Sequence, residues 1–344
     1  MYKKKIKIFF GAYLNYENAQ NLNCLALAKK LDPEKFTTYA LSIYSYDKVD
    51  TRAILFNCFY PFRISSNLGF LWGIIKCDIA YLPKHISTPN WVTYLAKFLG
   101  RKVFTTIENN MCDSKKESML NSFGSRQTLV SKFKSVQNIF GITQYIIDNA
   151  NCGVRLENKV LYLGVDIDLF FPRVRKRLRN IVFVGNLIKR KKAEEILLLA
   201  KQFSDLSFFI IGDGIEYLSL KSKATKNVTF LGHLNQQELS AKLSEMDLHI
   251  LPSKSEGFPK VILEAAASGI PSIVYSDYGA KEWIANGENG FVINEFEQFT
   301  TTIKCLLDNK ELLSKNSEGA ILMAKRFDWN IVIREWESTI YNLR

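Results

Sequence analysis

The chain has 344 residues, 47% of them hydrophobic and 23% charged, and its formal net charge is +12. This length suits two domains of ordinary size, and the composition excludes an intrinsically disordered protein. No run of about 18 apolar residues occurs, and the apolar stretch at residues 8–14 passes directly into Asn15 without a cleavage site, so neither a membrane span nor a signal peptide is predicted.

Short β-branched or aromatic runs alternate with longer helical stretches along the chain. In the first half, strands are predicted at residues 6–10, 37–43, 78–82, 102–107 and 138–142, with helices such as residues 18–31 and 90–99 between them. In the second half, strands are predicted at residues 180–184, 207–211, 228–231, 247–251, 271–275 and 290–293. Continuously apolar strands separated by helices indicate parallel sheets that are covered on both faces.

Two consecutive sets of such units predict an α/β protein with two Rossmann-like, doubly wound domains. We expect the first domain to span residues 1–165 and the second to span residues 166–328. A final helix within residues 329–344 is expected to pack back on the first domain. The basic segment 173–179 is interpreted as a solvated linker near the domain boundary.

The basic residues are unevenly distributed. Residues 1–165 contain 22 Lys and Arg against 11 Asp and Glu, whereas residues 166–344 contain 24 against 23. A basic first half suggests a polyanion or an anionic membrane surface as a partner. The six cysteines include no Cys-x-x-Cys pair and only three histidines are present, so we predict reduced core thiols in a cytoplasmic protein and no metal site.

The most informative stretch is residues 255–269, which follows a predicted strand at the edge where open α/β sheets bind ligands. Pro259 and Gly269 mark the two ends of a predicted helix that is apolar on nearly every side. Glu264 lies inside this helix and is therefore expected to be buried. It either pairs with a Lys or Arg elsewhere or accepts hydroxyl hydrogen bonds from a ribose.

Glu256 lies just before this helix. It is either a charge that favours the helix N-terminus or a direct ligand contact. Gly257 and Phe258 add backbone N–H groups, which suit an anion or a sugar hydroxyl at a helix start. Together these groups predict a ligand site.

Four consecutive cations, Lys189, Arg190, Lys191 and Lys192, follow the strand at residues 180–184 and the turn at Gly185. A diphosphate leaving group needs such cations because negative charge develops on its oxygens. The alternative is a solvated helix start, which the helix dipole disfavours, so phosphate contact is predicted. The next strand is followed by a short Gly-x-Gly turn, but the full dinucleotide fingerprint Gly-x-Gly-x-x-Gly is missing, which argues against a dehydrogenase.

In this order, the motifs resemble the retaining glycosyltransferases of family four, which have the GT-B fold. The spacing of Glu256 and Glu264 is that family's most recognisable motif. Further matches occur at residues 164–172, 183–191, 210–214, 228–232, 286–290 and 327–329. The resemblance covers about residues 138–343. It implies a nucleotide-diphosphate sugar as donor, bound between two domains, with no metal or other cofactor.

The resemblance also implies roles for individual residues. Glu256 is expected to contact the donor sugar near the reacting carbon, and Glu264 to hold the ribose. Lys191, helped by Arg190, is expected to neutralise the diphosphate, so that Glu256 and Lys191 are the predicted catalytic residues. The remaining predicted donor-binding residues are Gly11, Gly185, Asn186, Gly212, Gly232, His233, Leu234, Gly257, Phe258 and Pro259.

Two departures from the family pattern affect this assignment. Asn186 stands where the family often has Arg, so one diphosphate contact is either missing or supplied by Arg190. Gly11 is not followed by a second glycine, and Glu108 occupies roughly the place of a family histidine. The roles of Glu108 and of the amide-rich loop at residues 18–23 stay open. His249 is expected to be a satisfied core residue.

The expected activity is that of a retaining hexosyltransferase. We expect it to move a sugar from a UDP-sugar to a glycan or lipid-linked acceptor in the synthesis of cell-envelope polysaccharide or lipopolysaccharide. The alternatives are a non-hydrolysing nucleotide-sugar epimerase, which the few histidines disfavour, and a basic nucleic-acid-binding protein, for which no motif exists. Segments 62–76 and 91–102 mix large apolar side chains with cations. They are either ordinary amphipathic helices or a surface that binds an anionic membrane peripherally from the cytoplasmic side.

Overall fold

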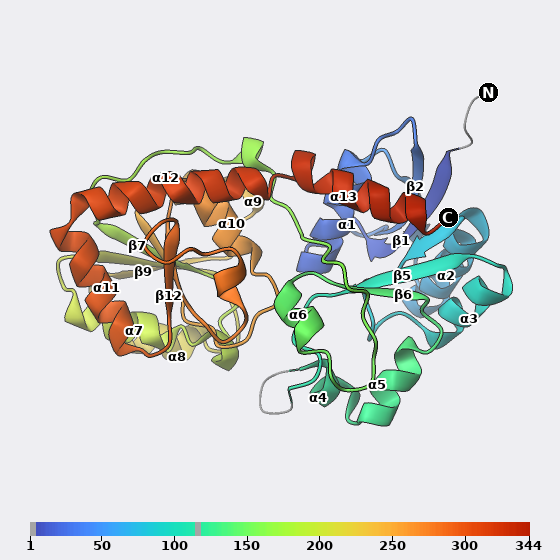
Figure 1. The fold of residues 1–344 in the computed structure, drawn as a ribbon, viewed down its shortest axis with the longest axis horizontal. Coiled ribbons are helices and arrows are strands. Elements are labelled where there is room, and N and C mark those ends of the chain that lie inside the picture. The colour runs from blue at the N-terminus through green and yellow to red at the C-terminus, as the bar shows by residue number, and fades with distance from the viewer. Residues whose placement is uncertain (1–4, 114–117) are drawn as a thin grey trace. The chain divides into compact units, whose positions relative to one another are not determined.

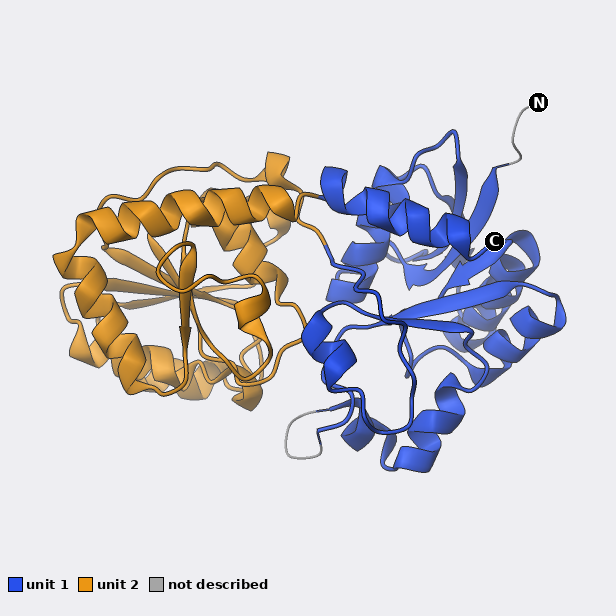
Figure 2. Ribbon diagram, viewed as in Figure 1, with its two compact units in different colours: residues 1–163, 329–344 blue, residues 164–328 orange. Residues whose placement is uncertain are grey.

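The computed structural model describes residues 5–113 and 118–344, and the chain divides into two compact units (Figure 2). Unit 1 comprises residues 1–163 and 329–344, and unit 2 comprises residues 164–328. The predicted division after residue 165 lies two residues beyond the end of the first part of unit 1. Helix α13 (Trp329–Asn342), at the end of the chain, belongs to unit 1.

Unit 1 contains a six-stranded parallel sheet in the order β3-β2-β1-β4-β5-β6. Its strands are β1 (Ile6–Tyr13), β2 (Phe36–Ile43), β3 (Ile54–Cys58), β4 (Ile79–Tyr81), β5 (Lys102–Ile107) and β6 (Asn138–Gly141). Its other helices are α1 (Ala19–Lys30), α2 (Phe62–Lys76), α3 (Asn90–Phe98), α4 (Met119–Phe123), α5 (Arg126–Phe133) and α6 (Gln144–Asp148).

Unit 2 repeats this topology with the sheet order β12-β11-β10-β7-β8-β9, again all parallel. Its strands are β7 (Asn180–Val184), β8 (Ser207–Ile211), β9 (Val228–Gly232), β10 (Leu248–Leu251), β11 (Ser272–Tyr275) and β12 (Gly290–Ile293). Its α-helices are α7 (Glu194–Gln202), α8 (Tyr217–Lys223), α9 (Gln236–Leu243), α10 (Lys260–Ala267), α11 (Glu297–Asp308) and α12 (Lys310–Arg326). Three short 3₁₀ turns are η1 (Ile167–Leu169), η2 (Lys189–Lys191) and η3 (Ala280–Glu282). Helices lie on both sides of the sheet, with α12 on one side and α7 and α8 on the other (Figure 1).

The prediction of two doubly wound α/β domains is confirmed, and all eleven predicted strands are present, with ends that differ by no more than three residues. The strand β3 was missed. It lies at the sheet edge and is mostly half-exposed, with the polar residue Asn57 within it, so it lacks the continuous apolar run of a strand buried on both faces.

The sheet of unit 1 is covered on both faces. Phe70 and Ile74 of α2 are buried in one cluster with Phe9 of β1. On the other face, the fully buried ring of Trp336 from α13 meets Tyr81 at 5.4 Å between ring centroids. Its indole nitrogen donates to the carbonyl of Tyr162. The final helix of the chain therefore completes the core of unit 1.

The interpretation of residues 173–179 as a solvated linker is wrong for Arg175. Its side chain is buried, and its guanidinium donates to the carbonyls of Ser244 (2.8 Å) and Ser268 (2.8 Å). These carbonyls lie at the C-terminal ends of α9 and α10, where a cation satisfies otherwise unpaired acceptors. Burial lowers the pKa of Arg175 to about 10.

The prediction that all six cysteines are reduced core thiols is wrong for three of them. Cys112 and Cys152 form a disulfide, and Cys305 is exposed on α11. Cys24, Cys58 and Cys77 are buried thiols outside the disulfide, as predicted. A pair 40 residues apart in sequence carries no spacing signal, so only the fold brings it together.

Candidate functional site

The candidate site lies in unit 2 at the point where the strand order reverses. β7 is the first strand of this sheet, β8 and β9 follow on one side of it, and β10 pairs with its other side. The loops after β7 and β10 therefore leave neighbouring strands in diverging directions. Open α/β sheets bind ligands at this topological switch point, at the carboxyl ends of the strands.

The backbones of the loops after β7, β8 and β9 are joined by hydrogen bonds. Gly185 N donates to Ile211 O (3.0 Å), and Gly212 N donates to Gly232 O (2.7 Å). Gly212 has a φ of +130°, and a Cβ there would lie 2.0 Å from the carbonyl oxygen of Gly185. Glycine is thus required at position 212, and three of the predicted donor-binding positions form one backbone surface.

The loops after β7 and β10 meet through Glu256. Lys191 Nζ lies 2.6 Å and Arg190 Nη1 lies 3.0 Å from the same carboxylate oxygen, Oε1 of Glu256. Arg190 Nη1 also donates to the carbonyl of Ser255, and the hydroxyl of Ser253 donates to the carbonyl of Arg190 (3.4 Å). The side chains of Glu256 and Lys191 are only 8% and 12% exposed. Two cations and one anion therefore form a largely buried cluster with one excess positive charge.

One expectation about the four cations is wrong. The cations lie in and just after the 3₁₀ turn η2, not at the start of a helix, and α7 begins only at Glu194, with two acidic residues in its first turn. The dipole argument against a solvated helix start therefore does not apply. Lys192 pairs with Glu195 (2.8 Å) and Lys189 is exposed, so Arg190 and Lys191 are the two that reach Glu256.

The motif after β10 is anchored by an aromatic side chain. Phe258 is buried, and its ring centroid lies 4.7 Å from that of Trp283 and 5.2 Å from that of Phe327. Gly257 and Pro259 are buried on either side of it, and Pro259 is the N-cap residue of α10. This packing fixes the short loop between Glu256 and the helix.

Glu264 is buried in α10, as predicted from the apolar character of the helix. Its Oε1 accepts a hydrogen bond from the amide of Gln236 on α9 (3.2 Å). Burial raises the pKa of Glu264, and the nearby charge of Lys260 acts in the opposite direction. Gln236, which the sequence reasoning did not identify, is thus a partner of Glu264, while the predicted ribose contact stays a prediction.

The residues predicted to meet the base follow β9. Gly232 ends that strand with a φ of +69°, His233 is exposed and Leu234 is half-buried. Asn186, after β7, is also exposed. These side chains and backbone groups are accessible on unit 2, on the carboxyl side of its sheet.

Two buried polar side chains next to the cluster have unsatisfied polar atoms that the sequence did not predict. The hydroxyl of Tyr278 and Nε2 of His249 have no hydrogen-bond partner within residues 5–113 and 118–344. Burial, and then the charge of Glu256, raise the pKa of Tyr278. Burial, and then the charge of Lys191, lower the pKa of His249 to about 3. Because only Nδ1 of His249 is bonded, to the hydroxyl of Ser272 (2.9 Å), the expectation of a fully satisfied core histidine is wrong.

Gly11 belongs to unit 1 and lies inside β1, not in the loop expected to follow a shorter strand. It is buried, and a Cβ there would lie 2.6 Å from a methyl carbon of Leu82, so close packing accounts for the glycine. Glu108, whose role was left open, accepts hydrogen bonds from Asn23 (3.3 Å) and Thr106 (3.3 Å). Residues 19–23, expected as a loop, form the first part of α1, so the bond from Asn23 joins this helix to the end of β5 within unit 1.

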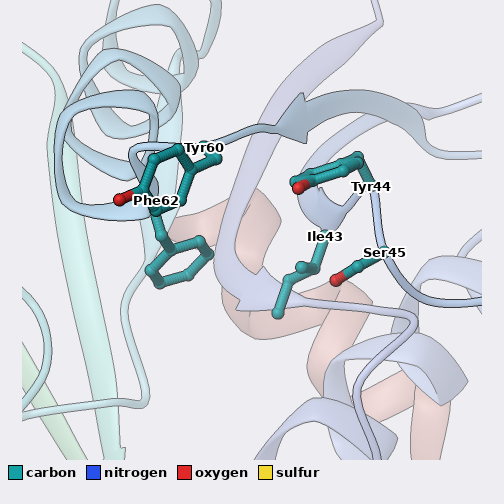
Figure 3. A pocket seen from close by; sticks show the side chains of 5 residues that line it. All are labelled: Ile43, Tyr44, Ser45, Tyr60 and Phe62. Atoms are coloured by element: carbon teal, nitrogen blue, oxygen red, sulfur yellow. The ribbon is translucent and has the colours of Figure 1, made fainter.

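A pocket of about 320 Å³ lies in unit 1 where β2 ends and α2 begins (Figure 3). It is lined by Ile43, Tyr44, Ser45, Tyr60 and Phe62. The sequence reasoning missed this pocket, although the aromatic run at residues 59–62 was a signal that could have pointed to it.

The described residues lack two further features. Within residues 5–113 and 118–344, no helix is both long and apolar enough to cross a membrane. In the same ranges, no group of three or more His, Cys, Asp or Glu side chains is arranged to hold a metal ion.

Comparison with known proteins gives a family match within unit 2. Residues 167–323 match the family model described as glycosyl transferases group 1. An uncharacterized glycosyltransferase of Haemophilus influenzae is 27% identical over 271 residues, which cover 75% of this chain and 69% of that protein. An Escherichia coli enzyme named UDP-Gal:alpha-D-GlcNAc-diphosphoundecaprenol alpha-1,3-galactosyltransferase is 29% identical over 197 residues, which cover 48% of this chain and 50% of that enzyme.

The fold is shared with solved structures. The crystal structure of Anabaena Alr3699/HepE in complex with UDP and glucose matches 98% of this chain and 100% of that chain, with a TM-score of 0.79 and 17% identity. At this identity, the likeness shows the GT-B fold and no more. The family match therefore places residues 167–323, within unit 2, in the glycosyl transferases group 1 family.

Proposed function

We propose that the protein transfers a hexose from a nucleotide-diphosphate sugar to an acceptor hydroxyl, with retention at the anomeric carbon. A single observation carries this proposal. Arg190 and Lys191 from the loop after β7 converge on Glu256 from the loop after β10, at the switch point of unit 2. Cations and a carboxylate in one cluster suit a ligand that carries a diphosphate next to a sugar.

In this proposal, Arg190 and Lys191 neutralise the diphosphate, and no metal is needed. As the bond between the sugar and the diphosphate breaks, negative charge grows on the leaving oxygen, and two fixed cations stabilise it more than they stabilise the ground state. Glu256 contacts the sugar near the reacting carbon. The turns at Gly185 and Gly212 let the diphosphate approach the backbone closely, and the amide of Gln236 orients Glu264 toward the ribose.

The proposed transfer step needs no basic side chain, because the leaving diphosphate takes the acceptor's proton. The bond from the anomeric carbon to the diphosphate oxygen breaks, and a bond to the acceptor oxygen forms on the same face of the sugar. The acceptor's hydroxyl proton passes to the leaving diphosphate oxygen, which takes the electron pair of the broken bond. The products are a glycoside with the donor's anomeric configuration and a nucleoside diphosphate.

The donor is proposed to be a UDP-sugar, with its base against residues 232–234 after β9. The support is the name of the E. coli relative and the UDP held by the Anabaena structure, both of which describe those proteins. The acceptor is proposed to be a glycan or lipid-linked saccharide of the cell envelope. The support for a lipid-linked acceptor is the same relative's name, which includes alpha-D-GlcNAc-diphosphoundecaprenol. A peripheral location at the cytoplasmic face of a membrane completes the proposal.

A donor screen tests the proposal on the full chain. Thermal unfolding is measured with UDP, GDP and ADP and with their sugars, and the best donor is then tested for hydrolysis and for transfer to saccharide acceptors. We expect UDP to raise the unfolding temperature most. The product's anomeric configuration, read by proton NMR, is expected to match the donor's. Binding of no nucleoside diphosphate would contradict the proposal, and a nucleotide sugar returned with an inverted sugar carbon would indicate an epimerase instead.

A further inference from the structure

Helix α2 carries an exposed apolar stripe. Ile64, Leu68, Leu71 and Ile75 are 59%, 45%, 37% and 52% exposed. Their spacings of four, three and four residues place them along one side of the helix. Another side holds Phe70, which is buried in the core of unit 1. A helix that only covered a sheet would turn polar residues outward, so the stripe needs another explanation.

Helix α3 repeats the pattern. Trp91, Tyr94 and Phe98 are 37%, 53% and 86% exposed, and their spacings of three and four residues again align them on one side. The opposite side holds Val92 and Ala96, which are buried against the sheet. Both neighbouring helices therefore present large apolar side chains away from the core.

The two stripes adjoin each other. Nε1 of Trp91 donates to Oδ1 of Asn67 on α2 (3.0 Å), and the two helices pack against each other. Asn67 immediately precedes Leu68 and lies one helical turn from Ile64 and Leu71. We call the surface formed by the two stripes the α2–α3 face.

Aromatic side chains continue from one end of this face. Phe62, the first residue of α2, is 42% exposed and also lines the pocket shown in Figure 3. Tyr44 and Tyr60, which line the same pocket, are 58% and 80% exposed. Tyrosine and tryptophan are the residues that favour the boundary between lipid chains and water.

The charges near the face favour one occupant. Residues 62–102 contain six Lys or Arg and a single acidic residue, Asp78. Lys76, Lys97 and Lys102 are exposed at the ends of α2 and α3 and at the start of β5. An anionic lipid surface complements both the apolar stripes and these cations, and it needs no shaped groove on the protein.

We propose that the α2–α3 face inserts its apolar side chains into the surface of a membrane that contains anionic lipid. The proposal rests on the proposed function, because a lipid-linked acceptor is presented at such a surface. The binding itself depends only on unit 1. Its test is therefore separable from a test of the donor site.

The test is co-sedimentation of the full chain with vesicles of phosphatidylcholine alone or mixed equally with phosphatidylglycerol, at low and high salt. The wild-type chain is expected to bind the anionic vesicles, more weakly at high salt. The variant L68S/L71S/F98S is expected to stay in solution. The variant K76Q/K97Q/K102Q is expected to bind about 100-fold more weakly, since each cation near the surface contributes about fivefold. The matched control L198S/L322S, which changes exposed leucines of unit 2, is expected to bind like the wild type.

Three results would overturn the proposal: no binding by the wild type, unchanged binding by L68S/L71S/F98S, or a wild-type dimer in light scattering that this variant lacks. The last result would assign the face to a second copy of the chain. UDP binding, measured on the same samples, distinguishes the two proposals. A chain that binds vesicles but no nucleoside diphosphate refutes the proposed donor chemistry alone. The reverse result refutes only the membrane binding and the peripheral location.

Discussion

Lys191 Nζ lies 2.6 Å from Oε1 of Glu256, the same oxygen that Arg190 contacts. The sequence predicted phosphate contact for the cations and sugar contact for the carboxylate, as separate roles. The structure joins these groups into one cluster. A diphosphate that binds Lys191 and Arg190 must therefore compete with Glu256 for them, so that ligand binding and the freeing of the carboxylate are coupled.

The variant Glu256→Gln tests this coupling. Removing the competing negative charge is expected to strengthen UDP binding by up to about tenfold, because the cations keep their positions but lose an anionic partner. Transfer is expected to fall by at least about 100-fold, the usual effect of losing a group that stabilises a transition state. Isothermal calorimetry and the transfer rate together check both effects. An active variant would remove Glu256 from the chemistry.

The variant Lys191→Met is expected to act in the opposite direction on binding. A charge-assisted hydrogen bond contributes about 1.5–3 kcal/mol, so UDP affinity should fall by about 10- to 100-fold. Lys189→Met is the matched control, because it removes the same charge two residues earlier from an exposed side chain. Equal losses in both variants would mean that only the overall charge of η2 matters, against the assigned contact.

The variant Gly212→Ala is expected to destabilise unit 2 by about 3 kcal/mol or more and to abolish donor binding. Its Cβ would lie 2.0 Å from the carbonyl oxygen of Gly185, in a backbone conformation that L-residues avoid. Gly287→Ala separates these causes, because Gly287 also has a positive φ but its Cβ would meet no atom within 4 Å. That control is expected to cost about 1 kcal/mol. Thermal unfolding with and without UDP checks both variants.

The sequence correctly predicted the position of a site residue where that position depends only on the strand that precedes it. Strands such as β7 and β8 are buried on both faces and read as continuous apolar runs, and the loops that follow them must lie at one edge of the sheet. Glu256 and Lys191 could therefore be assigned to the same edge from sequence. Their ion pair could not, because the direction of each side chain depends on packing by other loops.

Sequence patterns could not predict contacts between segments that lie far apart in the chain. Arg175 looked solvated because its neighbours are charged, yet it binds carbonyls about 70 and 90 residues further along the chain. The same applies to Gln236, whose partner Glu264 lies on another helix. The strand β3 was not predicted because it lies at the sheet edge, where a half-exposed strand lacks the continuous apolar run of a central one.

The variant Arg175→Ala is expected to lower the free energy of unfolding of unit 2 by about 3 kcal/mol. The change leaves the carbonyl of the buried Ser268 without its guanidinium donor, and the carbonyl of Ser244 keeps only the longer contact from Arg173 (3.3 Å). Arg177→Ala removes a charge from the same segment at an exposed position and is expected to change little. Denaturant unfolding of both variants distinguishes a structural arginine from a solvated linker.

The variant Glu264→Gln is expected to stabilise the ligand-free protein at neutral pH by about 1 kcal/mol, since it removes a buried carboxylate that is hydrogen-bonded to the neutral amide of Gln236. Burial raises the pKa of Glu264 above its ordinary value of 4.5 in the folded protein. Between these two pKa values, the folded state binds more protons than the unfolded state, so this group's contribution to stability falls as pH rises above about 4.5. The advantage of Glu264→Gln should therefore grow with pH across that window and then level off. With saturating UDP the order should reverse if, as proposed, the wild-type carboxylate accepts the ribose hydroxyls. Unfolding temperatures measured from pH 4 to pH 8, with and without UDP, check both signs, and a variant that is equally stabilised with UDP present would exclude Glu264 from the ribose site.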